Sequence, residues 1–274
     1  MTPRQQIAKV FEVAYLQVGF RLRSESGVEK GIEIRECAEL EELAQCVELQ
    51  REVFSLPEVE ISPVRHFVVT KNAGGFTLGA FFDGKLIGFV LSVPAFLRGE
   101  RAFYSHMTAV KPEFQSFGVG ARLKWAQRQR SLDVEVKFIK WTFEPWKARN
   151  AFFNLEKLGA TASDYEVNFY GTDYGSAPGG RIGLASDRLF AEWHLESSKV
   201  VSLSKGEPFP ENVSPEREIV IPNDWIQLVK TNPTLALKEQ MRIRSEFQSS
   251  FSSGLTAIGF IREAERPRYL LSRR

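Results

Sequence analysis

Two glycines lie in a stretch where the sequence changes from a strand-like to a helical pattern. Gly118 and Gly120 follow an apolar run over residues 102–110 and open a helical run over residues 117–130. The first N–H groups of a helix have no partner within the helix, and the helix dipole is positive at this end. Glycines carry no Cβ, so an anion can approach the backbone closely. The junction therefore predicts a phosphate-binding turn.

The spacing of these residues narrows the kind of phosphate site. The sequence has no Gly-x-x-x-x-Gly-Lys-Ser/Thr pattern, and Leu123 replaces the third glycine of the Gly-x-Gly-x-x-Gly dinucleotide motif. Taken alone, the two glycines are equally compatible with a tight, closely packed strand-to-helix turn. The stretch does contain Gln/Arg-x-x-Gly-x-Gly/Ala, running from Gln115 to Gly120, and Val110-x-Pro112-Glu113 precedes it. This pattern resembles the acyl-coenzyme A signature of the GCN5-related N-acetyltransferase (GNAT) superfamily, and the resemblance extends over residues 31–195.

The resemblance implies an N-acetyltransferase that moves an acetyl or other short acyl group from acyl-coenzyme A to an amine. Acetyl-coenzyme A is the expected donor, coenzyme A the product, and no metal is expected. Backbone N–H groups of the turn are expected to hold the pyrophosphate, and an N–H near Ala109 or Val110 is expected to polarise the thioester carbonyl. The predicted coenzyme A site comprises Thr108, Ala109, Val110, Gln115, Ser116, Phe117, Gly118, Val119, Gly120, Ala121, Asn150 and Asn154.

The segment 149–159 resembles the family helix that lies beside the pantetheine arm. Asn150 and Asn154 are one turn apart on one helix face, so their amides are candidates for holding pantetheine; solvated surface positions are the equally ordinary interpretation. Many family members have a tyrosine four residues before the closing glycine, where it protonates the departing thiolate. Leu155 occupies that position, which puts a dedicated general acid in doubt.

Deprotonation of an amine acceptor requires a base, and histidine has the unperturbed pKa nearest to neutral. Strand alternation places Tyr104, His106, Thr108 and Val110 on one face, which makes His106 the first candidate for the catalytic base. A structural histidine within a sheet is the alternative interpretation. Glu144, directly after the strand 137–143, is the second candidate, although a carboxylate that caps the next helix is equally ordinary.

The predicted elements alternate between strands and helices. Asp83–Gly84 favours a type I′ turn between two strands. The mixed order predicts an α/β (α+β) fold with a GNAT-like, mixed but mostly antiparallel central sheet flanked by helices, plus a C-terminal α/β segment. The sequence patterns predict strands at 32–35, 76–82, 86–93, 104–110, 137–143, 165–170 and 189–195, and helices at 38–54, 63–70, 117–130 and 146–158.

Three parts of the chain are expected. These are an N-terminal helical extension (1–30), a GNAT-like acyl-coenzyme A-binding domain (31–203) and a C-terminal segment (204–274). Residues 204–222 are rich in Pro, Glu, Ser and Lys, which predicts a linker or a segment that wraps around the domain. A helix at 234–251 and strands at 256–262 and 269–271 follow. This tail is too small for a deep core of its own, so we expect it to pack on the main domain.

Composition limits the class of protein. The chain has 274 residues, 43% of them hydrophobic, and a net charge of +2 with dispersed basic residues, so we expect no nucleic-acid partner. The apolar N-terminal stretch is too short and too polar for a membrane span. Two cysteines without metal-ligand spacing predict reduced thiols in a cytoplasmic protein. The acceptor is expected to be a small-molecule or peptide amine, and a homodimer through the N-terminal helix stays open.

Two other functions remain open at the level of sequence. One is a regulatory protein that binds coenzyme A or acyl-coenzyme A without turning it over, which the absent tyrosine favours. The other is an aminoacyl transferase of related fold that uses charged tRNA. A concentrated basic groove would be expected in that case, and the sequence shows none.

Overall fold

A computed structural model describes residues 22–23, 29–54, 56–174, 183–209 and 214–273. The predicted N-terminal helix falls within residues 1–21 and therefore lies outside the described residues. Two short strands, β1 (Leu22–Arg23) and β2 (Glu29–Lys30), pair with each other ahead of the main fold. No described helix combines the length and the apolar character that crossing a membrane requires.

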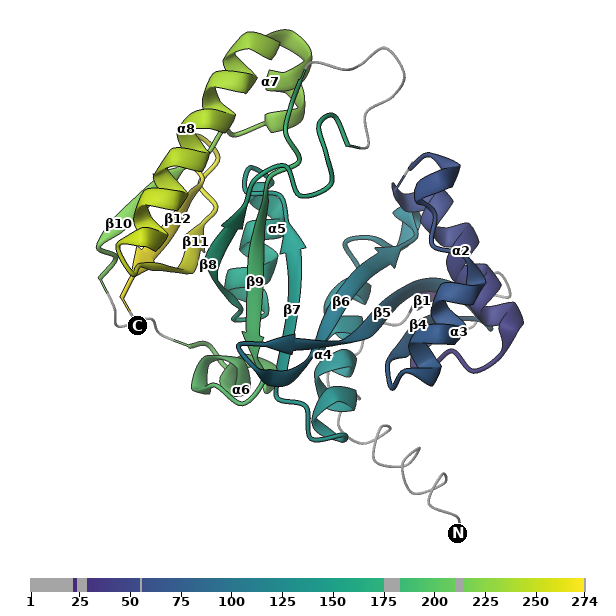
Figure 1. Ribbon diagram of the computed structural model, residues 1–274. Coiled ribbons are helices and arrows are strands. Elements are labelled where there is room, and N and C mark those ends of the chain that lie inside the picture. The colour runs from purple at the N-terminus through teal and green to yellow at the C-terminus, as the bar shows by residue number, and fades with distance from the viewer. Residues whose placement is uncertain (1–21, 24–28, 55, 175–182, 210–213, 274) are drawn as a thin grey trace.

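A ten-stranded sheet forms the centre of the molecule, in the order β10-β12-β11-β8-β9-β7-β6-β5-β4-β3. Neighbouring strands pair antiparallel except β6 and β7, which are parallel. This confirms the predicted mixed, mostly antiparallel sheet (Figure 1). The strands are β3 (Glu33–Glu36), β4 (Phe76–Phe82), β5 (Lys85–Leu97), β6 (Glu100–Val110), β7 (Phe138–Phe143), β8 (Thr161–Glu166), β9 (Arg188–His194), β10 (Arg217–Val220), β11 (Thr256–Ile261) and β12 (Arg268–Ser272).

The hairpin between β4 and β5 forms where it was predicted. Asp83 and Gly84 both have positive φ, 51° and 73°, as a type I′ turn requires. Of the predicted strand at 165–170, only residues 165 and 166 lie in a strand, so the prediction is wrong from residue 167 onward. β8 ends at Glu166, and Asn168 adopts a φ of 54° because its N–H donates to the buried carboxylate of Asp187 instead of to a strand.

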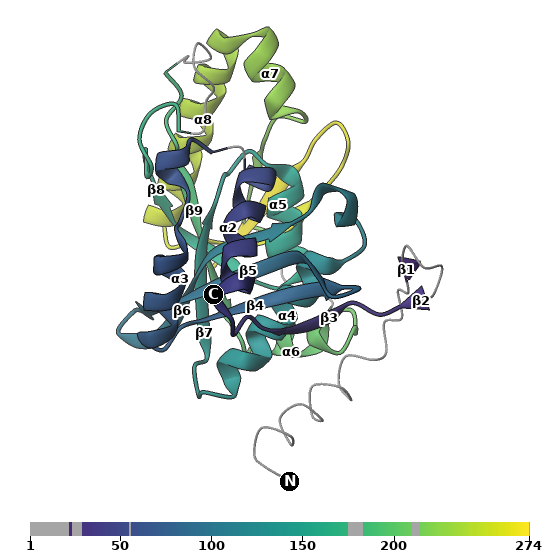
Figure 2. The ribbon, with the colours of Figure 1, turned by 90° about the vertical axis from the view of Figure 1, so that its right-hand side faces the viewer.

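Helices cover both faces of the sheet. The helices α2 (Leu40–Phe54) and α3 (Val64–Asn72) pack on one face, where they share a core with Phe89 and Ala109. On the other face lies α4 (Val119–Leu132), followed in the chain by α5 (Ala148–Phe152) and the π-helical turn η3 (Phe153–Lys157). Figure 2 shows α2 across β4 and β5, on the side of the sheet that faces away from α4. Two helix layers therefore enclose the strands that carry the predicted site.

The C-terminal part extends the same sheet. β11 joins β8 at the pair Ala257 and Ala162, and β12 and β10 follow outward. The helices α6 (Ser198–Ser204), α7 (Trp225–Thr231) and α8 (Pro233–Ser252) complete the fold. The predicted linker at 204–222 is wrong at its end, because β10 pairs with the distant β12, a non-local contact that local composition does not reveal. The boundaries after residues 30 and 203 remain a prediction.

Candidate active site

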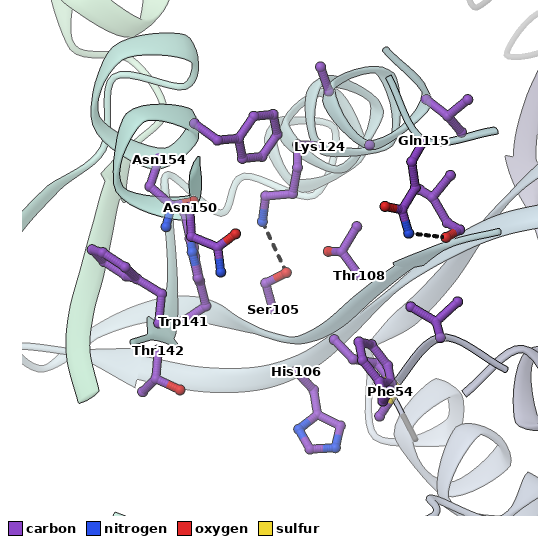
Figure 3. Close-up of a pocket in the computed structure, with 18 of the residues that line it drawn as sticks. Phe54, Ser105, His106, Thr108, Gln115, Lys124, Trp141, Thr142, Asn150 and Asn154 are labelled. Atoms are coloured by element: carbon purple, nitrogen blue, oxygen red, sulfur yellow. Dashed lines mark hydrogen bonds between the residues drawn. The ribbon is translucent and has the colours of Figure 1, made fainter. Parts of the chain in front are cut away.

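A cavity opens where two neighbouring strands diverge. β6 and β7 pair only at Phe103–Ile139 and Tyr104–Lys140, so the β6 edge beyond Tyr104 has no strand partner there. The cavity has a volume of about 2260 Å³ and is lined by β6, β7, α5, η3 and the start of α4 on one side of the sheet. It also reaches residues of α2 and α3 on the other side. The cavity therefore passes through the gap in the sheet (Figure 3).

The backbone of β6 presents N–H groups to this gap. Lys111 N donates to Ile87 O on β5, and the register then alternates between hydrogen-bonded and non-bonded pairs. This alternation directs the N–H groups of Val110 and Thr108 away from β5 and toward the cavity, whereas that of Ala109 faces β5. Gln115 Nε2 donates to Val110 O at 3.0 Å, which fixes this end of the strand. Of the two predicted carbonyl-polarising groups, the geometry favours Val110.

The glycine turn forms the wall of the cavity beside this strand end. Gly118 is the N-cap of α4 with a φ of 75°, and Arg122 N is the first to donate back, to Gly118 O. The amides of the first turn are thus left without intrahelical partners at the cavity. A Cβ on Gly118 would meet no described atom within 4 Å. Close packing therefore does not explain this glycine, whereas its left-handed backbone conformation does.

The two asparagines also face the cavity. Asn150 from α5 and Asn154 from η3 both line it, and the Asn154 side chain is only 5% exposed. Figure 3 shows both amides on the side of the gap across from Gln115. Of the remaining predicted coenzyme A residues, Ser116, Val119, Gly120 and Ala121 line the cavity, whereas Phe117 and the side chain of Ala109 do not.

His106 lies on the face of the sheet opposite to the one that strand alternation predicts for it. The register of β5 and β6 shifts between Leu91–Met107 and Ser92–Ser105, so His106 is the extra residue of a β-bulge. Thr108 then points toward α4 while His106 points away from it (Figure 3). The predicted common face of Tyr104, His106, Thr108 and Val110 is therefore wrong, because a bulge interrupts the period of two.

The surroundings of His106 keep its imidazole neutral. Its ring centroid lies 5.3 Å from that of His66 on α3, and Nε2 lies 3.4 Å from Ser62 Oγ. Loss of hydration in the cavity wall and, second, the neighbouring His66 lower the pKa of His106 to about 4. The second candidate base, Glu144, does not line the cavity, and its carboxylate forms an ion pair with Lys147. Of the two candidate bases, His106 therefore lines the cavity and Glu144 does not.

The sequence was also compared with models of known protein families. Residues 39–159, somewhat less than half of the chain, match the model of the acetyltransferase (GNAT) family. These residues form a GNAT acetyltransferase domain. No curated protein matches it.

Solved GNAT structures are similar at low sequence identity. A protein from Acinetobacter baylyi ADP1 assigned to the acetyltransferases is 16% identical, with a TM-score of 0.50; the match covers 61% of this chain and 94% of that one. The ribosomal-protein-S18-alanine N-acetyltransferase from Escherichia coli is 15% identical, with a TM-score of 0.47 and coverages of 67% and 99%. A GNAT acetyltransferase from Elizabethkingia anophelis with acetyl-CoA bound is 17% identical, with a TM-score of 0.46 and coverages of 61% and 100%.

This GNAT domain has a leucine at the position where the sequence pattern expects a tyrosine. Leu155 is fully buried in the main core and does not line the cavity. The π-helical turn contributes to this placement, since Leu158 N donates to Phe153 O, five residues earlier. Among the residues predicted from the sequence, none supplies a general acid at this position.

Sequence reasoning missed a polar cluster inside the GNAT cavity. Lys124 on α4 is only 3% exposed and lines the cavity together with Ser105 and Trp141. A lysine within a helix rich in Arg, Gln and Lys is usually solvated, so its type gave no signal of burial.

Proposed function

We propose that the protein transfers an acyl group from acyl-coenzyme A to an amine by direct attack in a ternary complex. One observation carries the proposal: the unpaired edge of β6 leads from the glycine turn into a cavity that passes through the sheet. A thioester placed along this edge is reachable from the α2–α3 face. The GNAT family of residues 39–159 supports the same chemistry.

On the donor side, the first N–H groups of α4 would hold the pyrophosphate of acetyl-coenzyme A. Asn150 and Asn154 would hold the amides of pantetheine. One of the β6 N–H groups that face the gap, that of Thr108 or that of Val110, would donate to the thioester oxygen as it gains negative charge, and such a preorganised donor lowers the barrier by about 3 kcal/mol. Each of these backbone and side-chain groups lies at the cavity in the structure.

On the acceptor side, the amine nitrogen attacks the thioester carbon, the C–S bond breaks, and the thiolate leaves as coenzyme A. The proton of the attacking amine passes to His106, which is neutral at physiological pH because its pKa is about 4. His106 faces the α2–α3 side, so a small-molecule or peptide amine would enter there. The thiolate takes up a proton from solvent, since no tyrosine occupies position 155.

Thermal unfolding with and without coenzyme A tests the donor site, because a ligand that binds the native state raises the unfolding midpoint. We expect a clear rise with coenzyme A and with acetyl-coenzyme A. Thiol release in the presence of a panel of amines then tests turnover. A rise in midpoint without thiol release from any amine would support the regulatory alternative, and no rise at millimolar ligand would contradict the donor site.

A further inference from the structure

Lys124 is a buried amine surrounded by neutral groups. Its Nζ donates to Gln127 Oε1 at 2.7 Å and to Ser105 Oγ at 3.0 Å, and it lies 3.9 Å from the ring centroid of Trp141. These three contacts match the three N–H bonds of an ammonium group. Gln127 in turn donates to Ser92 Oγ, so the polar network ends in hydroxyl groups.

No negative charge compensates this amine within the described part of the chain. None of its printed partners is a carboxylate, and burial lowers the pKa of the Lys124 ammonium well below its ordinary value. A buried lysine without a counter-ion is costly, and buried charges in proteins are normally paired. Because Lys124 lines the cavity, a bound ligand can supply the missing charge.

The position of Lys124 along the donor path indicates which part of the ligand would reach it. Pantetheine has about twelve chain bonds between its phosphate and its sulfur, roughly the length of four extended residues. Four residues back along β6 from Val110 is His106, so the sulfur reaches this part of the strand. The next position is Ser105, where Lys124 donates its hydrogen bond. An acyl group beyond the sulfur would therefore lie against Lys124, whose side chain points toward Ser105 (Figure 3).

The end of the gap where β6 and β7 pair carries polar groups beside the ring of Trp141. Ser105 and Lys124 line this side of the gap. Thr142, whose Oγ1 lies 3.3 Å from Tyr104 Oη and 3.4 Å from Tyr170 Oη, lines the cavity from the opposite face (Figure 3). Hydroxyl groups and an amine are suitable donors to a carboxylate.

We infer that the donor acyl group ends in a carboxylate, as in a dicarboxylic monothioester of coenzyme A such as succinyl-coenzyme A, and that Lys124 binds this carboxylate. The inference rests on the proposed function and names its donor class. The terminal carboxylate pairs with the Lys124 ammonium, and Ser105 is the neighbouring hydroxyl group. Trp141 forms the wall against which the methylene groups lie.

The test compares the affinities of coenzyme A, butyryl-coenzyme A and succinyl-coenzyme A for the full chain by calorimetry. Butyryl has the same number of carbons as succinyl but no charge. We expect the wild type to bind succinyl-coenzyme A about tenfold or more tightly than butyryl-coenzyme A, because a desolvated charge pair contributes more than its exposed counterpart. In Lys124→Met, which removes the charge and keeps the length, we expect this preference to disappear or reverse.

Two further variants complete the design. Lys124→Arg keeps the charge and is expected to retain part of the preference. Lys157→Met removes an exposed lysine from the rim of the same cavity and is expected to leave the ratio unchanged. Equal affinities in the wild type, or an unchanged ratio in Lys124→Met, would overturn the inference. Failure of coenzyme A and of both thioesters to bind would instead overturn the proposed function, and this inference with it.

Discussion

At the scale of single residues, substitution of Gly118 would affect both the backbone conformation and the proposed contact with the pyrophosphate. Gly118→Val places a side chain in a left-handed conformation and costs about 1–2 kcal/mol of stability. The added Cβ branches also occupy the space proposed for the pyrophosphate. We expect coenzyme A to give no rise in the unfolding midpoint of this variant.

Gly84 supplies the matched control for that substitution. It has nearly the same φ, 73°, and also open space around its Cβ position, but it lies in the β4–β5 turn away from the cavity. Gly84→Val should lose stability similarly and keep the response to coenzyme A. If Gly118→Val also kept that response, the glycine turn would not be the pyrophosphate site.

His106 provides a prediction about pH. Its pKa is about 4 in the folded protein and about 6.5 in an unfolded chain. The folded state therefore binds this proton less readily, so the contribution of His106 to stability is complete above pH 6.5 and is lost as the pH falls toward 4. In His106→Gln, we expect the free energy of unfolding to decline less between pH 7 and pH 4.5 than in the wild type.

The same substitution tests the catalytic role of His106. Removal of a general base lowers turnover by about 10²-fold or more, and the wild-type kcat should show no titration near pH 6.5. Coenzyme A affinity should be unchanged in His106→Gln. Near-normal turnover in the variant would assign the proton to water or to Glu144.

At the scale of elements, the sequence predicted most strands and helices but not their irregularities. The strands around the gap and α4 are local patterns of apolar residues and glycines, so they were predictable. The bulge at His106 depends on how β6 pairs with β5, and the burial of Lys124 depends on where β6 and β7 part. Both are non-local contacts, and they determine which side chains lie on each side of the gap.

An ion pair joins the C-terminal helix α8 to the strands next to the site. Arg244 donates two hydrogen bonds to the fully buried carboxylate of Asp187, at 2.9 Å and 3.0 Å, and Tyr165 Oη donates to the same group at 2.7 Å. Arg244→Leu leaves this carboxylate buried without its cation. We expect a loss of about 3–5 kcal/mol in the free energy of unfolding, measured by denaturant titration.

An exposed arginine serves as the comparison for that loss. Arg51 makes ion pairs with Glu48 and Glu58 on the surface of α2. Because solvent screens such pairs, Arg51→Ala should leave the denaturation midpoint essentially unchanged. Similar shifts in both variants would show that burial of Asp187 does not strengthen its pair with Arg244.

At the scale of the whole molecule, the C-terminal segment and the GNAT domain share one core. Phe247 on α8 is fully buried, with its ring centroid 5.7 Å from Tyr165 of β8 and 5.0 Å from Tyr269 of β12. Tyr269 Oη also donates to Pro145 O, directly after β7, at 2.6 Å. Contacts of this kind couple the outer strands to the strand that borders the cavity, so we expect both parts to unfold in a single cooperative transition.

Phe247→Ala tests this coupling, since loss of a buried phenylalanine costs about 3–5 kcal/mol. If the molecule is one cooperative unit, loss of coenzyme A binding and loss of secondary structure will shift by the same amount along a denaturant titration. Phe247 lies outside the cavity lining, so the variant's affinity for coenzyme A under native conditions should equal that of the wild type. The alternative outcome is two separate transitions, of which Phe247→Ala shifts only the one in which coenzyme A binding is kept. That outcome would mean that residues 204–274 unfold independently of the domain on which they pack.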